Sequence, residues 1–93
     1  MAEKFLPIGT VVLLKGGTKR MMITGYCMAS PQKPDVIFDY AGCVFPEGFI
    51  LDNKVGLFNH DEIERIDHMG LSDDEQKAFV SKLKEVIKES QSE

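Results

Sequence analysis

Positive charge is scarce in this sequence. The 93 residues contain 11 Lys and Arg against 15 Asp and Glu, which gives a net charge of −4. Proteins that bind nucleic-acid backbones usually carry a basic excess, because counterion release from the phosphates supplies much of the affinity. The closest group of basic residues, Lys15, Lys19 and Arg20, is interpreted as keeping a hairpin tip soluble. We therefore expect no nucleic-acid partner.

Long hydrophobic runs are also missing. No apolar stretch approaches the roughly 20 residues that span a bilayer, and Met1–Phe5 lacks the basic region and apolar core of a secretory signal. We therefore expect a cytoplasmic protein without membrane insertion. The hydrophobic content of 43% is that of an ordinary globular chain, and 93 residues are enough for one modest core.

Residues suited to metal binding or nucleophilic catalysis are few. The two cysteines, Cys27 and Cys43, have no His or Cys at the spacing of a zinc site. Neither has an adjacent His that would activate it as a nucleophile. Both are expected to be free, buried thiols, and a disulfide between them remains open if their strands are neighbours.

His60-Asp61 is the pair that most resembles a metal-binding dipeptide. Metal phosphohydrolases use such a pair inside a mainly helical domain with several further ligands, whereas the pattern here is β-like. We interpret it as a polar turn whose side chains cap the backbone. Glu62 and Glu64 alternate with Ile63, which places them on a solvated face and not in the desolvated pocket that a general acid needs. We expect no enzyme activity, no metal and no cofactor.

Residues 1–70 carry the pattern of short strands separated by glycine-containing turns. The first strand, about Thr10–Lys15, is apolar on both faces, which predicts cover on both sides, one side by a C-terminal helix. Gly16-Gly17-Thr18 then forms a hairpin turn. Further strands are predicted at about Arg20–Met28, Asp35–Val44, Val55–Phe58 and Glu64–Met69, with a proline-containing loop over Ser30–Pro34.

A single helical turn is predicted before the last strand. Asn59 is a favourable N-cap, and Glu62 completes a capping box three residues later. One such turn before a short final strand is typical of SH3-like barrels. The sequence therefore predicts a mainly β, α+β chain in which residues 1–70 form a small five-stranded SH3-like barrel.

Residues 71–93 are predicted to contain one amphipathic helix. A second capping box over Ser72–Glu75 starts it, and the helix is expected to reach about Lys88. Phe79, Leu83, Val86 and Ile87 recur at helical spacing and form one apolar face. That face packs on the barrel, on a second copy of the chain or on a partner, and the sequence leaves these alternatives open.

The candidate binding turn of the β region is Phe45-Pro46-Glu47-Gly48-Phe49. Two aromatic rings flank a rigid turn, and they either fill the core or form an adaptable interface. Together with the helix face, this turn supplies the candidate protein-binding residues Phe45, Pro46, Phe49, Phe79, Leu83 and Val86.

Several segments taken together carry a resemblance to a known family. They read LPIGTVVLLKGG over residues 6–17, MITG over 22–25, FDYAGCVFPEG over 38–48 and FNHDEI over 58–63. The combination resembles a family of small proteins of unknown function from Gram-positive bacteria, often encoded beside type VII secretion genes and their LXG-type toxins. The resemblance covers roughly residues 5–70, and the last motif departs slightly because Glu62 stands between Asp61 and Ile63.

The resemblance implies a cellular role but no catalytic residues. It implies a cytosolic accessory of toxin export, an adaptor or chaperone, which binds an LXG-type toxin or a secretion component. Whether the protein forms a homodimer stays open. The alternative is an immunity protein that neutralises a co-encoded toxin, since a small acidic protein is suited to masking a basic catalytic cleft.

Overall fold

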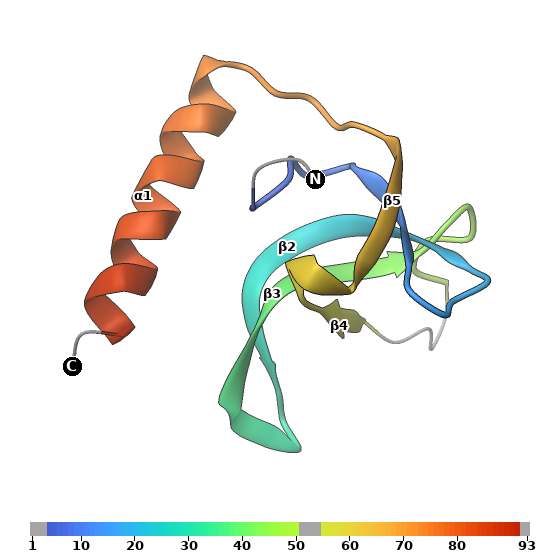
Figure 1. The fold of residues 1–93 in the computed structure, drawn as a ribbon, viewed down its shortest axis with the longest axis horizontal. Coiled ribbons are helices and arrows are strands. Elements are labelled where there is room, and N and C mark those ends of the chain that lie inside the picture. The colour runs from blue at the N-terminus through green and yellow to red at the C-terminus, as the bar shows by residue number, and fades with distance from the viewer. Residues whose placement is uncertain (1–3, 51–54, 92–93) are drawn as a thin grey trace.

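The described part of the chain folds into one antiparallel sheet followed by one C-terminal helix. The computed structural model describes residues 4–50 and 55–91 of the chain. Figure 1 shows the strongly curved sheet on one side and the helix on the other. The elements are β1 (Val11–Leu14), β2 (Arg20–Ser30), β3 (Lys33–Val44), β4 (Gly56–Phe58), the one-turn 3-10 helix η1 (His60–Glu62), β5 (Ile63–His68) and α1 (Asp74–Gln91).

The five strands lie in the order β4-β3-β2-β1-β5, and every pairing is antiparallel. The prediction of a closed barrel is wrong, because β4 and β5 do not pair with each other in the part of the chain that the structure describes. Closure requires the two edge strands to exchange hydrogen bonds. Here β4 has only three residues, which pair with Tyr40–Gly42 of β3, and the sheet stays open.

The predicted strand positions are confirmed, with small differences at the ends. The clearest difference is the loop expected over Ser30–Pro34, because β2 reaches Ser30 and β3 already begins at Lys33. Proline is excluded from central strands because it lacks an N–H donor. Pro34 is tolerated because β4 pairs only with the far end of β3, which leaves the start of β3 at an edge.

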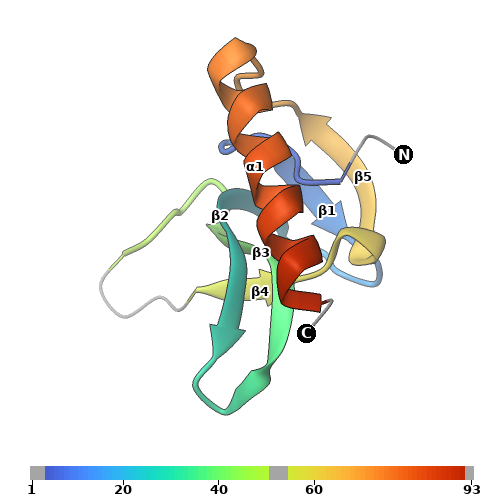
Figure 2. The ribbon, with the colours of Figure 1, turned by 90° about the vertical axis from the view of Figure 1, so that its left-hand side faces the viewer.

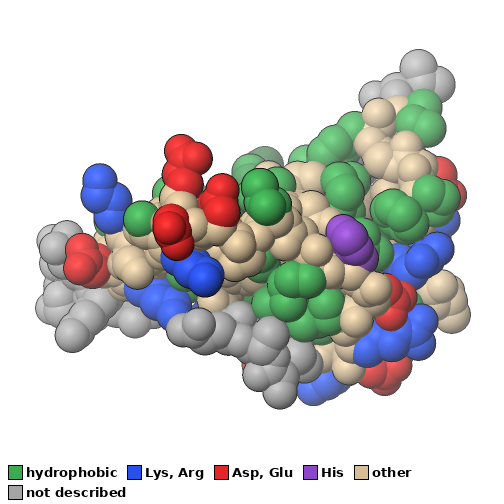
Figure 3. Space-filling model, turned by 90° about the horizontal axis from the view of Figure 1, so that it is seen from above, with side chains coloured by type: hydrophobic (Ala, Val, Ile, Leu, Met, Phe, Trp, Pro, Cys, Tyr) green, Lys and Arg blue, Asp and Glu red, His purple; other side chains and the backbone are tan. Residues whose placement is uncertain are grey.

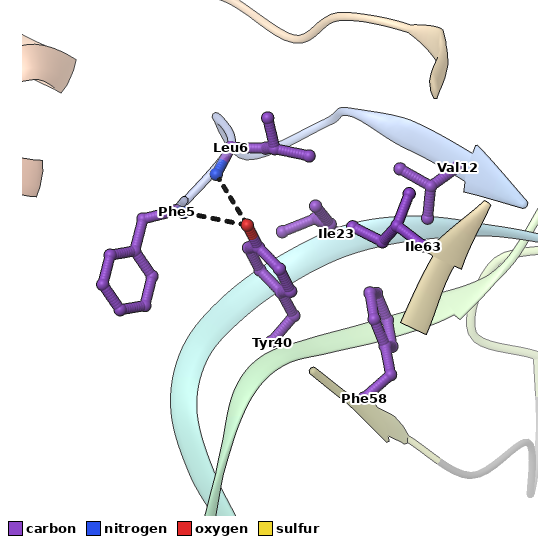
Figure 4. Packing of buried hydrophobic residues seen from close by; sticks show 7 residues of the cluster. All are labelled: Phe5, Leu6, Val12, Ile23, Tyr40, Phe58 and Ile63. Carbon is purple, nitrogen blue, oxygen red and sulfur yellow. Dashed lines mark hydrogen bonds between the residues drawn. The ribbon is translucent and has the colours of Figure 1, made fainter. Parts of the chain in front are cut away.

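The core fills the concave side of the sheet. Seven buried side chains form it, each at most 5% exposed, and Figure 4 shows them converging from the N-terminal segment, four strands and the start of β5: Phe5, Leu6, Val12, Ile23, Tyr40, Phe58 and Ile63. Val80, Leu83 and Ile87 of α1 pack against this cluster. The helix therefore packs on its own sheet, one of the alternatives that the sequence left open.

Strand β1 is buried on both faces, as its sequence predicted. Val12 points into the core, and Val11, on the other face, is 4% exposed. The cover on the Val11 side differs from the prediction, because α1 packs against the cluster that contains Val12. Val11 instead borders a shallow hollow of about 470 Å³ that it shares with Met22 and Phe45.

Gly42 allows β2 and β3 to approach closely at the centre of the sheet. A Cβ atom on this residue would lie 2.5 Å from the carbonyl oxygen of Met22 and 3.3 Å from the Phe58 ring. Backbone cannot yield by that amount without breaking the pairing of Ile23 with Gly42. The first glycine of the FDYAGCVFPEG motif, Gly42, therefore has a structural explanation.

Candidate functional site

The N-terminal segment is held over the core by the hydroxyl of Tyr40. This oxygen accepts hydrogen bonds from the backbone N–H groups of Phe5 at 2.8 Å and Leu6 at 3.1 Å, as drawn in Figure 4. It also lies 2.7 Å from Nδ1 of His60. The Tyr26 hydroxyl donates to the Leu6 carbonyl. Burial raises the pKa of Tyr40 to about 12, so the hydroxyl keeps its proton throughout the physiological range.

The neighbouring motif residues form a second layer of hydrogen bonds. The Asp39 carboxylate accepts from the His60 N–H at 2.9 Å and pairs with Lys4 at 3.1 Å. The Asn59 side chain accepts from the Asp39 N–H at 3.0 Å. Glu62 accepts from the Asn59 N–H at 2.8 Å and completes the predicted capping box. These contacts place His60 in a structural turn, in agreement with its interpretation from the sequence.

Neither cysteine has the environment of a reactive thiol. Cys43 is buried, Cys27 is partly buried, and both are free, so the disulfide that the sequence left open is not formed. Burial, with a smaller contribution from Asp39, raises the pKa of Cys27 and disfavours its thiolate. Within residues 4–50 and 55–91, no three His, Cys, Asp or Glu side chains are grouped so as to hold a metal ion. In the same residues, no helix is long and apolar enough to cross a membrane.

The two aromatic rings of the candidate binding turn differ in their environment: one is packed and the other is exposed. Phe45 is half-buried, with the Arg20 guanidinium 4.9 Å from its ring centroid. Pro46 is exposed, and Phe49 keeps 52% of its surface exposed. An ion pair between Lys19 and Glu47, at 2.6 Å, joins the turn to the β1–β2 connection. Phe45 therefore covers the sheet, while Phe49 faces solvent.

The helix begins one residue later than predicted and is rotated from the predicted face. Asp73, not Ser72, caps it by accepting from the Gln76 N–H at 2.9 Å. Of the predicted binding residues, Leu83 is partly buried against the core. Phe79 and Val86 are 51% and 61% exposed, although the Phe79 ring still contacts Tyr26 at a centroid distance of 6.0 Å.

Phe79 and Val86 form an exposed stripe along one flank of α1. They are seven residues apart, which is two helical turns, so they lie above one another on the same side of the helix. The structure does not bring this stripe together with the Phe45–Phe49 turn. Figures 1 and 2 show α1 and the connection after β3 on different sides of the sheet.

The opposite flank of α1 borders a groove that the sequence did not predict. We call it the lysine groove, and its volume is about 390 Å³. One wall is the N-terminal segment Lys4–Pro7, and the other is α1; Lys4, Lys77 and Lys84 carry its positive charges. Seen from above, charged side chains gather over the helix and hydrophobic ones over the middle of the molecule (Figure 3). The signal in the sequence is the seven-residue spacing of Lys77 and Lys84.

The sequence is similar to a known protein family. A family model described as a domain of unknown function, DUF4176, matches residues 5–79, which is most of the chain. No curated protein and no solved structure matches.

Proposed function

We propose that this chain, which belongs to the DUF4176 family, is a non-enzymatic, cytoplasmic protein-binding module. The observation that carries this proposal is the exposed stripe of Phe79 and Val86 on a helix whose inner face is already packed. These two large apolar side chains lie in line on one flank and are not needed to pack the helix on the core. Exposed apolar residues arranged in this way mark interaction surfaces.

The contacts of α1 support the stripe as the binding surface. Val80, Leu83 and Ile87 face the core cluster, so the helix is anchored without Val86. Phe79 is only partly used in packing, because its ring contacts Tyr26 while 51% of its surface stays exposed. A partner helix laid alongside this flank buries both side chains without any rearrangement of the sheet.

We further propose that the partner is an LXG-type toxin or a component of the type VII secretion system. The support is the motif resemblance to a family encoded beside such genes. In this role the protein acts in the cytoplasm as an adaptor or chaperone before export. The exposed Phe49 at the end of the candidate binding turn is a second contact point on the opposite side of the molecule.

The test is co-purification from a native host, with LXG-type toxins and secretion components as the expected partners. We expect the tagged protein to capture such a partner, and Val86→Glu to reduce capture at least about tenfold by placing a charge in an apolar contact. Ala78→Glu is the matched control, because it adds the same charge at another exposed position of α1. Circular dichroism checks that both variants keep their helix. Failure of the unaltered protein to capture any toxin or secretion component contradicts the proposal.

The alternative is an immunity protein, and the net charge of −4 is the observation that favours it. An acidic surface complements the basic cleft of many nucleic-acid-degrading toxins. Expression of this chain alone, in cells that produce an LXG-type toxin in the cytoplasm, separates the two functions. An immunity protein rescues growth, whereas a secretion accessory leaves the cells sensitive.

A further inference from the structure

Helix α1 is attached to the sheet by few side chains. In residues 74–87 of α1, whose side chains the structure describes, none is buried. Val80, Leu83 and Ile87 are only partly buried where they pack against the core cluster. Most of the stability of a helix in a protein comes from packing of this kind. Because α1 has little of it, we expect the helix to open more easily than the sheet.

Both flanks of α1 are open as well. On one flank, Phe79 and Val86 are about half exposed. On the other flank, the lysine groove of about 390 Å³ separates the helix from the N-terminal segment Lys4–Pro7. Between the flanks, the Phe79 ring contacts Tyr26 of β2, and Gln76 forms a side-chain hydrogen bond with the same tyrosine. The contact of α1 with the sheet is therefore confined to one narrow face of the helix.

The connection between β5 and α1 has a hinge at Leu71. Gly70 is tied to the sheet, because its N–H donates to the hydroxyl of the buried Thr10 at 3.0 Å. Asp73 is tied to the helix, because its carboxylate accepts from the Gln76 N–H at 2.9 Å. Leu71 lies between them and is 76% exposed. Figure 1 shows this connection crossing from the sheet to the helix as an extended chain. A rotation at one or two residues therefore moves the helix as a unit.

We propose that α1 is a strap that detaches from the sheet by rotation about Leu71, while the five strands stay folded. In the closed state, which the structure shows, the helix covers Tyr26 and one side of the core cluster. In the open state it uncovers this surface together with its own Val80, Leu83 and Ile87. Opening therefore converts a narrow exposed stripe into a wide apolar face. It needs no partner, so it is tested separately from the proposed binding function.

An open α1 is expected to lose most of its helical hydrogen bonds. A short isolated helix is marginally stable in water even when it is rich in alanine, and α1 contains one alanine among its 18 residues. The amides of α1 therefore exchange with solvent whenever the strap is open. The amides of β2 and β3 exchange only when the sheet itself opens. The difference in exchange between helix and sheet is therefore a direct measure of detachment.

Hydrogen–deuterium exchange of the full chain, followed by mass spectrometry, tests the proposal. Amides in the middle of α1 are expected to be protected at least about tenfold less than those of β2 and β3. Phe79→Ala removes the contact with Tyr26 and is expected to speed exchange throughout α1 at least about threefold, with β2 and β3 unchanged. Val86→Ala is the matched control and is expected to leave exchange unchanged or slower. Both substitutions raise intrinsic helix propensity, so faster exchange in Phe79→Ala alone reports a loss of docking.

A third variant tests whether the sheet stays folded without the strap. Leu83→Asp places a charge on the docked face of α1 and is expected to hold the strap open. The amides of α1 then lose their protection and the helical circular dichroism signal falls, while β2 and β3 keep their protection within about tenfold. Three results each overturn the proposal: equal protection of α1 and the sheet in the unaltered chain, equal acceleration by Phe79→Ala and Val86→Ala, or unfolding of the sheet in Leu83→Asp.

Discussion

Replacement of Tyr40 by Phe tests whether one hydroxyl group holds the N-terminal segment in place. The substitution keeps the ring, which is fully buried and contacts Phe5 and Phe58, and removes only the oxygen. The N–H groups of Phe5 and Leu6, which now point at that oxygen from 2.8 and 3.1 Å, lose their acceptor inside the core.

The magnitude follows from these unpaired donors. Each buried donor left without a partner costs about 1–3 kcal/mol, and partial relaxation reduces the total below the simple sum. We expect Tyr40→Phe to lower the free energy of unfolding by about 2–4 kcal/mol. Urea denaturation followed by far-UV circular dichroism measures this change.

Tyr26→Phe is the matched control. The Tyr26 hydroxyl donates one hydrogen bond, to the Leu6 carbonyl, and the residue is only partly buried. Removal of this hydroxyl leaves no N–H donor without an acceptor, and it is expected to lower the free energy of unfolding by about 1 kcal/mol. A loss for Tyr40→Phe that is below about 1 kcal/mol, or no greater than that of the control, refutes the anchoring role.

The remaining predictions concern alkaline stability, the sheet centre and the exposed stripe. The pKa of Tyr40 is raised from 10.0 to about 12, so the unfolded chain releases this proton first: stability is complete below pH 10 and falls by about 2–3 kcal/mol as the pH rises to 12. The absorbance of tyrosinate follows the titration of Tyr40, because the sequence has only one other tyrosine, Tyr26, whose pKa is also raised by burial. A Tyr40 that titrates near pH 10 contradicts the burial argument. Gly42→Ala is expected to destabilise the fold by more than about 2 kcal/mol, because its Cβ atom would clash with backbone. Gly16→Ala is expected to cost about 1 kcal/mol, because only the positive φ of 75° opposes a side chain there. Chemical denaturation compares the two variants, and equal losses would exclude the clash. Val86→Ser is expected to change stability by less than about 0.5 kcal/mol, and a larger loss would show that Val86 belongs to the core.

Local patterns predicted the elements of this fold well. The run of apolar residues before Gly16-Gly17 predicted β1, and Asn59 with Glu62 predicted the single turn before β5. Closure of the sheet was not predictable in this way. Closure depends on whether the two edge strands, β4 and β5, pair with each other across the molecule. In the described residues β4 pairs only with Tyr40–Gly42 of β3 and not with β5.

The candidate site was predicted only in part. Helical periodicity identified Phe79, Leu83 and Val86 as one apolar face, but it does not fix how the helix is rotated on its sheet. The structure turns Val80 and Leu83 inward and leaves Val86 outside. The lysine groove was missed because its walls come from segments about seventy positions apart in the sequence.

The strand order has a consequence for how the protein is made. Strand β1 lies between β2 and β5, so one of its edges stays without hydrogen-bond partners until residues 63–68 have left the ribosome. During that interval the nascent chain presents an apolar strand with unpaired backbone groups, which is a template for aggregation. The vulnerable period therefore ends only when β5 has emerged, and a chaperone that covers β1 until then is expected to raise the yield of folded protein.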